Sequence, residues 1–441
     1  MKSKTIILAM IAVLCIVAAI FLLRAEKLVE AIVALVGTLA FSVKFAFSLN
    51  ININSGFADK QMKTILAAFE KNATDKEKWE TEKERLEKTI ADLRKGTLVW
   101  DTISSFLEKG EIQKAIEAID TDASDKDAAH KHIAKAQLYI LNFQFDKAEQ
   151  HYIKAADISH SYDTNLALAD FYNNQNMLHE AIEYYARCLN FEISLGEKAT
   201  VLNLMGNMQS QNNDYSAEKS YQGALEIYRQ LAEKKPKAYL PDVAMTLNNL
   251  AILYEMNKDY PKAEKEYDEA LEIQRQLAEK NPKAYLPDVA ITLNNLAILH
   301  RCVENYPQAK KEHDEALEIR RKLAQEKPKV YLPDVATTLN NLANVHADIN
   351  DYYLHLQAEK EYDEALEIRR KLAQENPKAY LPDVATTLNN LAVFYQNNVP
   401  NKELSLQYAN EAIETLDQCN DTPFVGELRK KTERVIQNWQ Q

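Results

Sequence analysis

The carboxy-terminal half of the chain repeats one pattern of apolar and polar positions four times. The segment LPDVA recurs with its proline at positions 241, 287, 333 and 382, in steps of 46, 46 and 49 residues. Each unit contains two sets of apolar positions, each of which falls on one face of a helix; the first set has the spacing i, i+3, i+4, i+7. In the first unit these sets are Leu247, Leu250, Ala251 and Tyr254, followed by Tyr260, Ala263, Tyr267 and Ala270. A fixed period of this length predicts a stack of helix pairs.

The ends and the contacts of these helices follow from proline and from small residues. Pro241 suits the first turn of a helix, and Asp242 places a carboxylate at the positive end of the helix dipole. Pro236 ends the preceding helix, and the same pair of prolines, five residues apart, recurs in the other three units. Alanines on the facing surfaces let two helices approach closely, while tyrosines fill the space beside them.

Upstream of these units the repeats are shorter and more degenerate. Residues 97–240 carry similar small and aromatic spacing, with a worn first unit, and bring the total to about eight hairpins. Residues 241–421 hold the four long repeats. Residues 422–441 are predicted to form a capping helix, which the open end of a stack needs. Only eight glycines occur in the 441 residues, and this scarcity of helix breakers also favours an all-α chain.

The amino terminus carries an apolar segment without a charge. Residues 5–23 are 19 consecutive uncharged residues, and as a helix they would span roughly 28 Å, close to the thickness of a bilayer core. A cleaved signal peptide is the alternative, but the run is long for one, and no A-x-A-like site follows it. We therefore assign residues 1–54 to a membrane anchor that the mature protein retains.

A second apolar stretch, residues 28–49, leaves the number of membrane spans open. As a helix it would complete a two-pass hairpin and place both chain ends in the cytosol. From Phe41 to Ile53, however, every odd position is apolar, which is the alternation of a strand. A single pass with the amino terminus inside would instead export the remainder of the chain. We favour the hairpin, and on a shallow bias of basic residues we predict a membrane protein whose repeats are cytoplasmic.

Residues 55–96 are predicted to form a highly charged linking helix. Trp79, Leu86, Ile90 and Leu93 follow one another in steps of seven, four and three, a short heptad-like seam typical of a coiled coil. Such a helix serves either as a spacer or as the contact between the two copies of a homo-dimer. The sequence leaves both interpretations open.

The small and aromatic positions of each long unit resemble those of the tetratricopeptide repeat. The matching residues of the first long unit, in order, are Leu250, Ala251, Tyr254, Tyr260, Ala263, Tyr267 and Ala270. The units are longer than the 34 residues usual in that family, and with PDVA and LNNLA in them they are most similar to the repeats of kinesin light chains. The resemblance implies an all-α, right-handed superhelical solenoid of antiparallel helix pairs, preceded here by a transmembrane helix or hairpin.

Charge and motifs argue against nucleic-acid binding and against catalysis. The net charge is −12, which does not attract a phosphate backbone. The chain contains no HExxH, P-loop or G-x-S-x-G motif, and neither its cysteines nor its histidines have the spacing of a metal site. His300 and His346 occupy positions that hold Tyr254 and Tyr395 in sister repeats, so we interpret them as packing residues. We expect no enzyme activity, no cofactor and no metal.

The strongest candidate for a functional site is the pair of asparagines in LNNLA. These residues are Asn248 and Asn249, Asn294 and Asn295, Asn340 and Asn341, and Asn389 and Asn390. The first helices of successive hairpins line the concave surface of such a solenoid, and an amide that both donates and accepts suits the backbone of an extended peptide. In kinesin light chains the matching asparagines line the groove for cargo peptides, so the resemblance implies the same use here. The alternative is that the second asparagine of each pair is structural and bonds the neighbouring hairpin.

The sequence therefore predicts a membrane-anchored scaffold that binds a partner protein or an extended peptide in its groove. Two further hypotheses stay open. The chain would serve as a non-catalytic structural subunit of a membrane complex for secretion or envelope assembly, or as a kinesin-light-chain-like cargo adaptor. The membrane segment argues against the adaptor, since that family begins with a soluble heptad region.

Overall fold

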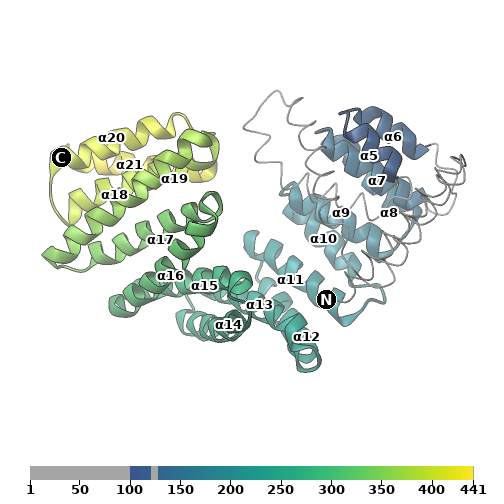
Figure 1. Cartoon of the computed structure of the whole chain (residues 1–441), viewed down its shortest axis with the longest axis horizontal. Helices are drawn as coiled ribbons and strands as arrows, with labels where there is room; N and C mark the ends of the chain where they lie inside the picture. Colours follow the sequence, from purple (N-terminus) through teal and green to yellow (C-terminus); the bar gives the residue numbers. More distant parts are fainter. Residues whose placement is uncertain (1–99, 121–127, 441) are drawn as a thin grey trace, which may run out of the picture. The chain divides into compact units, whose positions relative to one another are not determined.

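A computed structural model describes residues 100–120 and 128–440 of the chain (Figure 1). These residues form 17 helices and no strand, which confirms the predicted all-α class for this part of the protein. The predicted membrane segments, residues 5–23 and 28–49, and the predicted linking helix lie outside the described residues. Of the helices that the structure describes, none combines the length and the apolar character that crossing a membrane requires.

The boundary between two compact units falls inside helix α8, between Ala148 and Glu149. The described helices of the first unit are α5 (Trp100–Leu107), α6 (Ile112–Asp120) and α7 (Ala128–Leu141), followed by the beginning of α8 (Phe145–Ile158). Their apolar faces enclose a small core whose fully buried residues include Ile103, Leu107, Leu138 and Leu141. This core joins the helix pair α5 and α6 to the helix α7 that follows.

The second unit consists of helix pairs that follow one another along the chain (Figure 1). After the end of α8, the shorter pairs are α9 (Tyr162–Asn174) with α10 (Leu178–Cys188) and α11 (Leu195–Gln211) with α12 (Ala217–Lys234). The four long pairs are α13 (Pro236–Met256) with α14 (Tyr260–Lys280), α15 (Pro282–Cys302) with α16 (Tyr306–Glu326), α17 (Pro328–Asp348) with α18 (Tyr352–Glu375), and α19 (Pro377–Asn397) with α20 (Lys402–Leu416). The first helices of neighbouring pairs, from α11 to α19, also contact one another, which places them on the inner side of the stack.

The small and aromatic positions of the repeats form the contacts between helices, as predicted. In the first long pair Ala251, Ala263, Ala270 and Tyr267 are fully buried. Alanine at these places lets the helices approach, and the Tyr267 ring fills the space that remains. One apolar cluster continues from α11 and α12 through this pair into α15 and α16. Each repeat is therefore stabilised by its neighbours as well as by its own two helices.

The long first helices begin five residues earlier than the sequence predicts. Helix α13 starts at Pro236 and continues through Pro241, and the other three long first helices pass through their second proline in the same way. The prediction that Pro241 stands in the first helical turn is therefore wrong. Proline suits the first position, where its missing N–H has no helical partner to lose. At Pro241 the missing N–H leaves the carbonyl of Lys237 without its helical donor, and Lys237 lies exposed at the helix end, where water can replace it.

Helix α21 (Pro423–Asn438) covers one end of the stack. It packs against α19 and α20, and the Thr432 hydroxyl donates to Asn389 Oδ1 over 3.0 Å. The corresponding bond between long repeats runs from the Thr292 hydroxyl to Asn248 Oδ1 over 3.2 Å, so α21 takes the place of a further first helix. Much of its sequence is Glu, Arg and Lys, which suits the capping role predicted for residues 422–441.

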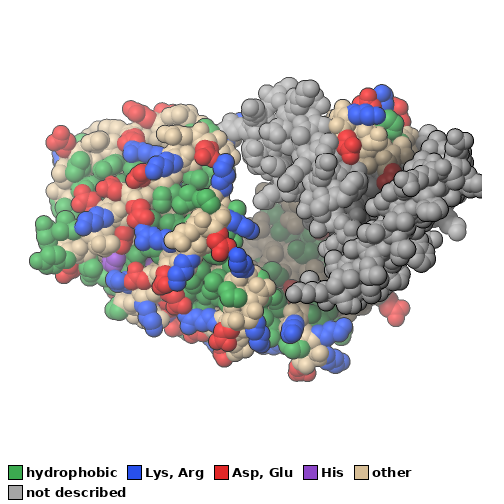
Figure 2. Space-filling model, viewed as in Figure 1, with side chains coloured by type: hydrophobic (Ala, Val, Ile, Leu, Met, Phe, Trp, Pro, Cys, Tyr) green, Lys and Arg blue, Asp and Glu red, His purple; other side chains and the backbone are tan. Residues whose placement is uncertain are grey.

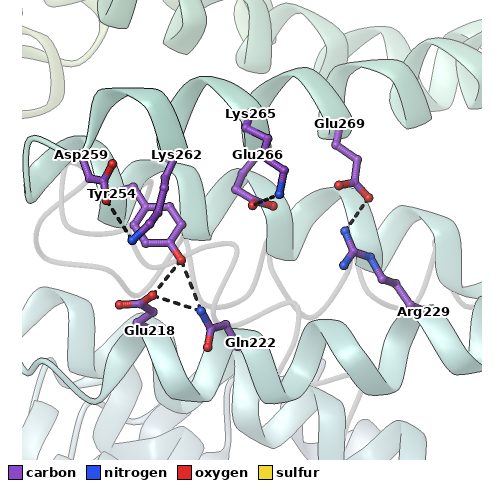
Figure 3. Close-up of polar contacts among 9 residues, drawn as sticks. All are labelled: Glu218, Gln222, Arg229, Tyr254, Asp259, Lys262, Lys265, Glu266 and Glu269. Carbon is purple, nitrogen blue, oxygen red and sulfur yellow. Dashed lines mark hydrogen bonds and ion pairs between the residues drawn. The ribbon is translucent and has the colours of Figure 1, made fainter.

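Successive second helices are joined by ion pairs at one repeating position. In Figure 3, Arg229 of α12 donates to Glu269 of α14 over 2.5 Å. The same pair recurs as Arg275 with Glu315 at 2.7 Å, as Arg321 with Glu364 at 2.6 Å, and as Arg370 with Glu411. These side chains are partly exposed to water, so each pair contributes less than about 1 kcal/mol to stability.

Candidate functional site on the inner face of the long repeats

The inner helices carry one partly open position per long repeat, three residues before the LNNLA asparagines. Met245 on α13 and Ile291 on α15 occupy it in the first two units and are 45% and 43% exposed. Thr337 and Thr386 occupy it in the next two, and each hydroxyl donates to the carbonyl four residues earlier. Two exposed apolar side chains on neighbouring inner helices form a surface suited to contact with another chain.

The first asparagine of each pair is mostly buried and accepts a hydrogen bond from the following repeat. Asn294, Asn340 and Asn389 are 7%, 4% and 7% exposed, whereas Asn248 is half-buried. Oδ1 of Asn248 accepts from a threonine hydroxyl of α15, and Oδ1 of Asn389 accepts from a threonine hydroxyl of α21. Such bonds satisfy buried amides and hold the first helices together.

The second asparagine supplies the donor in further bonds of this kind. Three of them run from Nδ2 of the second asparagine to Oδ1 of an asparagine in the preceding repeat: Asn249 to Asn207 (3.2 Å), Asn341 to Asn294 (3.3 Å) and Asn390 to Asn340 (3.1 Å). Asn295 lies half-buried at the same position. The structure thus brings asparagines of neighbouring repeats together, in the role that the alternative hypothesis gives to the second of each pair.

These bonds identify which asparagine is best placed to meet a ligand. A side chain that is more than nine-tenths buried offers little surface, and its removal would leave its neighbour without a partner. Asn248 differs from its three counterparts because it is half-buried and lines a pocket. The peptide-binding role of the eight asparagines stays a prediction, and Asn248 is the one best placed to contact a ligand.

A pocket of about 270 Å³ lies between α13, α14 and α15. Its walls are Pro241, Asp242, Ala244, Met245, Asn248, Gln274, Leu277, Tyr285, Asp288, Ile291 and Thr292. The two exposed apolar residues of the inner face, Met245 and Ile291, both belong to it. The walls combine apolar side chains with two carboxyls and two amides, and none of the lining residues is basic. This composition favours a ligand that carries hydrogen-bond donors or a positive charge.

Gln274 of α14 brings a buried amide to the pocket. The side chain is 5% exposed, and its Oε1 has no hydrogen-bond donor among the residues that the structure describes. A buried carbonyl without a donor costs about 1–3 kcal/mol, and a ligand that supplies the donor would remove this cost. The sequence prediction did not include Gln274. The only signal for Gln274 in the sequence is that it differs from the matching residues of two sister repeats, which are Arg320 and Arg369.

Asp242 and Asp288 bring two carboxyls to the pocket from the PDVA segments of neighbouring repeats. Burial raises the pKa of each carboxyl group above its ordinary value. A raised pKa shows that the ionised form is poorly compensated at this place. A cation bound beside these carboxyls would favour the ionised form and lower both pKa values again.

His300 and His346 are buried packing residues, as predicted. His300 Nδ1 bonds Glu312 over 2.7 Å, and its Nε2 bonds Glu264 over 3.1 Å. The bond to Glu312, opposed by burial and assisted by Glu264, raises the pKa of His300 to about 9. His346 Nδ1 bonds Glu361 over 2.8 Å. Within residues 100–120 and 128–440, no three metal-ligating side chains gather into a site.

Comparison with known families identifies the repeats. A family model described as the tetratricopeptide repeat matches residues 197–276, 242–322 and 288–371, which include every wall of the pocket. These residues carry tetratricopeptide repeats, and the predicted repeat type is confirmed for them. The likeness to kinesin light chains in particular stays a prediction. A search of curated proteins gave no significant match.

Solved structures of similar fold extend over more of the chain. The apo form of RapI is 15% identical, with 80% of this chain and 98% of that chain covered and a TM-score of 0.50. A Signal Transduction ATPase with Numerous Domains that has a tetratricopeptide repeat sensor, from Pyrococcus horikoshii, is 14% identical, with 90% of this chain and 54% of that chain covered and a TM-score of 0.53. At these identities the similarity concerns the fold alone.

Proposed function

We propose that this chain is a protein-interaction scaffold that binds a partner protein on the inner face of its repeats. The observation that carries the proposal is the pocket between α13, α14 and α15, whose walls include the two exposed apolar residues Met245 and Ile291. Stacked helix pairs present an extended inner surface of this kind to a ligand. The resemblance of the long repeats to those of kinesin light chains leads us to propose an extended peptide segment as the part of the partner that is bound.

The chemistry of the pocket favours binding rather than catalysis. Its polar groups are the carboxyls of Asp242 and Asp288 and the amides of Asn248 and Gln274, set among apolar walls. A few polar groups in an apolar pocket orient a ligand and select it. We therefore propose a function without chemical turnover.

The surface charge supports a protein partner over a nucleic acid. Figure 2 shows basic and acidic side chains interspersed over the face of the long repeats, with hydrophobic patches between them. The chain as a whole carries a net charge of −12. Mixed charges with an acidic excess do not provide the basic stripe that a phosphate backbone requires.

We further propose that residues 5–23 anchor the scaffold in a membrane, with residues 28–49 as a second span and the repeats on the cytoplasmic side. The uncharged run of 19 residues supports this proposal. Full-length protein should stay in the membrane pellet after extraction at alkaline pH, and protease added to sealed cells should spare the repeats. Digestion of the repeats from outside would contradict the cytoplasmic placement.

Charge substitutions on the inner face test the binding proposal. The double variant Met245→Glu, Ile291→Glu should lose the partners that the wild-type chain captures in its native cell, because it places two charges on an apolar contact surface. The matched control is Gln230→Glu, Gln325→Glu, at exposed positions of the second helices α12 and α16. Equal loss in both variants, or capture by both at the wild-type level, would contradict binding through the inner face.

A further inference from the structure

Two sister repeats show what the space around Gln274 accepts. In the next long repeat Arg320 stands at the position of Gln274 and is 5% exposed. Its Nη1 donates to the main-chain carbonyl of Asp334 over 3.1 Å and to the Thr338 hydroxyl over 2.5 Å. The guanidinium therefore lies between its own second helix and the first helix of the following repeat.

The same arrangement recurs one repeat later. Arg369, also 5% exposed, donates through Nη1 to the carbonyl of Asp383 over 3.0 Å and to the Thr387 hydroxyl over 2.6 Å. The acceptors stand 14 and 18 residues after the arginine in both repeats. Two independent copies of the repeat thus hold a buried guanidinium against the same two groups.

The pocket occupies the corresponding place in the first long repeat. Counting 14 and 18 residues from Gln274 gives Asp288 and Thr292, and both line the pocket. Glutamine is shorter than arginine and brings only one amide, and its Oε1 faces no donor among the described residues. The groups that hold a guanidinium in the sister repeats are therefore present here, while the guanidinium itself is missing.

We propose that this pocket receives the guanidinium of an arginine side chain from an extended segment of the partner. The proposal rests on the proposed binding function and specifies its ligand. The guanidinium would donate to Gln274 Oε1 and to the main-chain carbonyl of Asp288, and Asp242 and Asp288 would balance its charge. Guanidinium suits such a site because it presents five donors in a fixed plane.

The apolar walls select for the rest of that side chain. Met245, Leu277 and Ile291 line the pocket beside the carboxyls, and three methylene groups of an arginine stem would pack against them. Lysine carries its charge at a single point and cannot donate in several directions at once within one plane. Citrulline keeps the shape of arginine and loses the charge. Arginine should therefore bind more tightly than either.

A swap between sister repeats tests this inference. The probe is a fluorescein-labelled heptapeptide with one central arginine among alanine and leucine, compared with otherwise identical peptides that carry lysine, citrulline or glutamate. The full-length protein in detergent is titrated with each peptide by fluorescence anisotropy. Gln274→Arg fills the pocket as the sister repeats do, and Arg320→Gln opens a second space of the same kind. Circular dichroism verifies that each variant remains folded.

The arginine peptide should bind the wild-type chain at least tenfold more tightly than the citrulline and glutamate peptides. Gln274→Arg should weaken this binding at least tenfold, and Arg320→Gln should add a second binding site per chain. Absence of arginine-peptide binding to the wild-type chain, or binding that Gln274→Arg leaves unchanged, would overturn the pocket assignment. Partner capture that is lost in Met245→Glu, Ile291→Glu and retained in Gln274→Arg would overturn it while leaving the scaffold function in place.

Discussion

His300 illustrates how one side chain links neighbouring repeats through charge. It lies on α15 and its side chain is only 4% exposed. Its two ring nitrogens bond Glu312 on α16 and Glu264 on α14. Sister repeats place Tyr254 and Tyr395 at this position, and Figure 3 shows the Tyr254 hydroxyl bonded to Glu218 and Gln222 of the preceding pair. A phenol and an imidazole therefore perform the same structural task, but only the imidazole changes charge near neutral pH.

This difference predicts a pH-dependent stability. The pKa of His300 is raised to about 9 in the folded chain, against an ordinary value near 6.5, so its contribution is fully present below about pH 6.5 and is lost as the pH rises through about 9. The difference in unfolding free energy between wild type and His300→Tyr should fall by up to about 3 kcal/mol between pH 6 and pH 9.5. Urea denaturation at several pH values measures it, with His179→Gln, at an exposed position, as the control.

If the difference in unfolding free energy between wild type and His300→Tyr stayed constant over this pH range, it would contradict the ion pair assigned to His300. A difference that grows toward alkaline pH would contradict even its sign, because it would mean that the neutral imidazole is the form the fold prefers.

Replacing a glycine inside a helix by alanine usually stabilises a protein, but at Gly206 on α11 we expect the opposite. A Cβ added there would stand 2.8 Å from the ring of Tyr221, whose hydroxyl is held by Asn207 over 2.8 Å. Gly206→Ala should therefore lower the unfolding free energy by about 1–3 kcal/mol. Gly426 on α21 has no atom within 4 Å of an added Cβ, so Gly426→Ala should raise it by about 0.5–1 kcal/mol. Equal shifts of both variants in thermal melts would contradict the close packing at Gly206.

At the scale of elements, neighbouring repeats are joined on two sides by contacts of different strength. The first helices share hydrogen bonds between asparagines whose acceptor side chain is buried, whereas the second helices share ion pairs that are partly exposed. Buried groups that lose a partner carry the full cost of desolvation, while exposed ion pairs are weakened by water and salt. We therefore expect the inner side to determine how firmly one repeat holds the next.

A pair of substitutions measures this contrast. Asn340→Ala removes the acceptor of Asn390 Nδ2 and should lower the unfolding free energy by about 1–3 kcal/mol. Arg275→Ala breaks the ion pair with Glu315 and should lower it by less than about 1 kcal/mol, with a smaller effect still in 1 M salt. Denaturant unfolding of both variants at low and high salt distinguishes them. A larger loss for Arg275→Ala would contradict the proposed division of strength.

Helix pairs and their order could be predicted from the sequence. The geometry of the helical backbone determines how the apolar residues of one face are spaced, and the fixed period shows where each pair repeats. The start of α13 at Pro236 could not be predicted, because a second proline within a helix is tolerated only where an exposed carbonyl can turn to water. The pocket also escaped prediction. It depends on the length of one side chain, Gln274, between two helices whose spacing the rest of the repeat sets. The hydrogen-bond partners of the buried Asn294 and Asn340 likewise could not be predicted, because each partner lies a whole repeat away in sequence.

At the scale of the whole molecule, the long repeats are nearly identical, so the few residues that differ between them would determine which ligand is bound and where. The long repeats share their PDVA and LNNLA segments, so the backbones of their helix pairs are nearly the same. The first long repeat has Gln274 where the next two have arginine, and the first two long repeats have Met245 and Ile291 where the last two have threonine. These differences open a pocket with exposed apolar walls on the inner face. The junction of the first two long repeats would thereby become the binding site of the scaffold.

Site-specific photo-crosslinking in the native cell tests the inner face as a protein-binding surface most directly. A photoreactive phenylalanine replaces Met245 or Ile291 on the inner face and, as controls, exposed Gln230 or Gln325 on the second helices. We predict the same discrete protein adduct from both inner positions and none from the controls. Adducts from the second helices alone, or no adduct from either inner position, would contradict it.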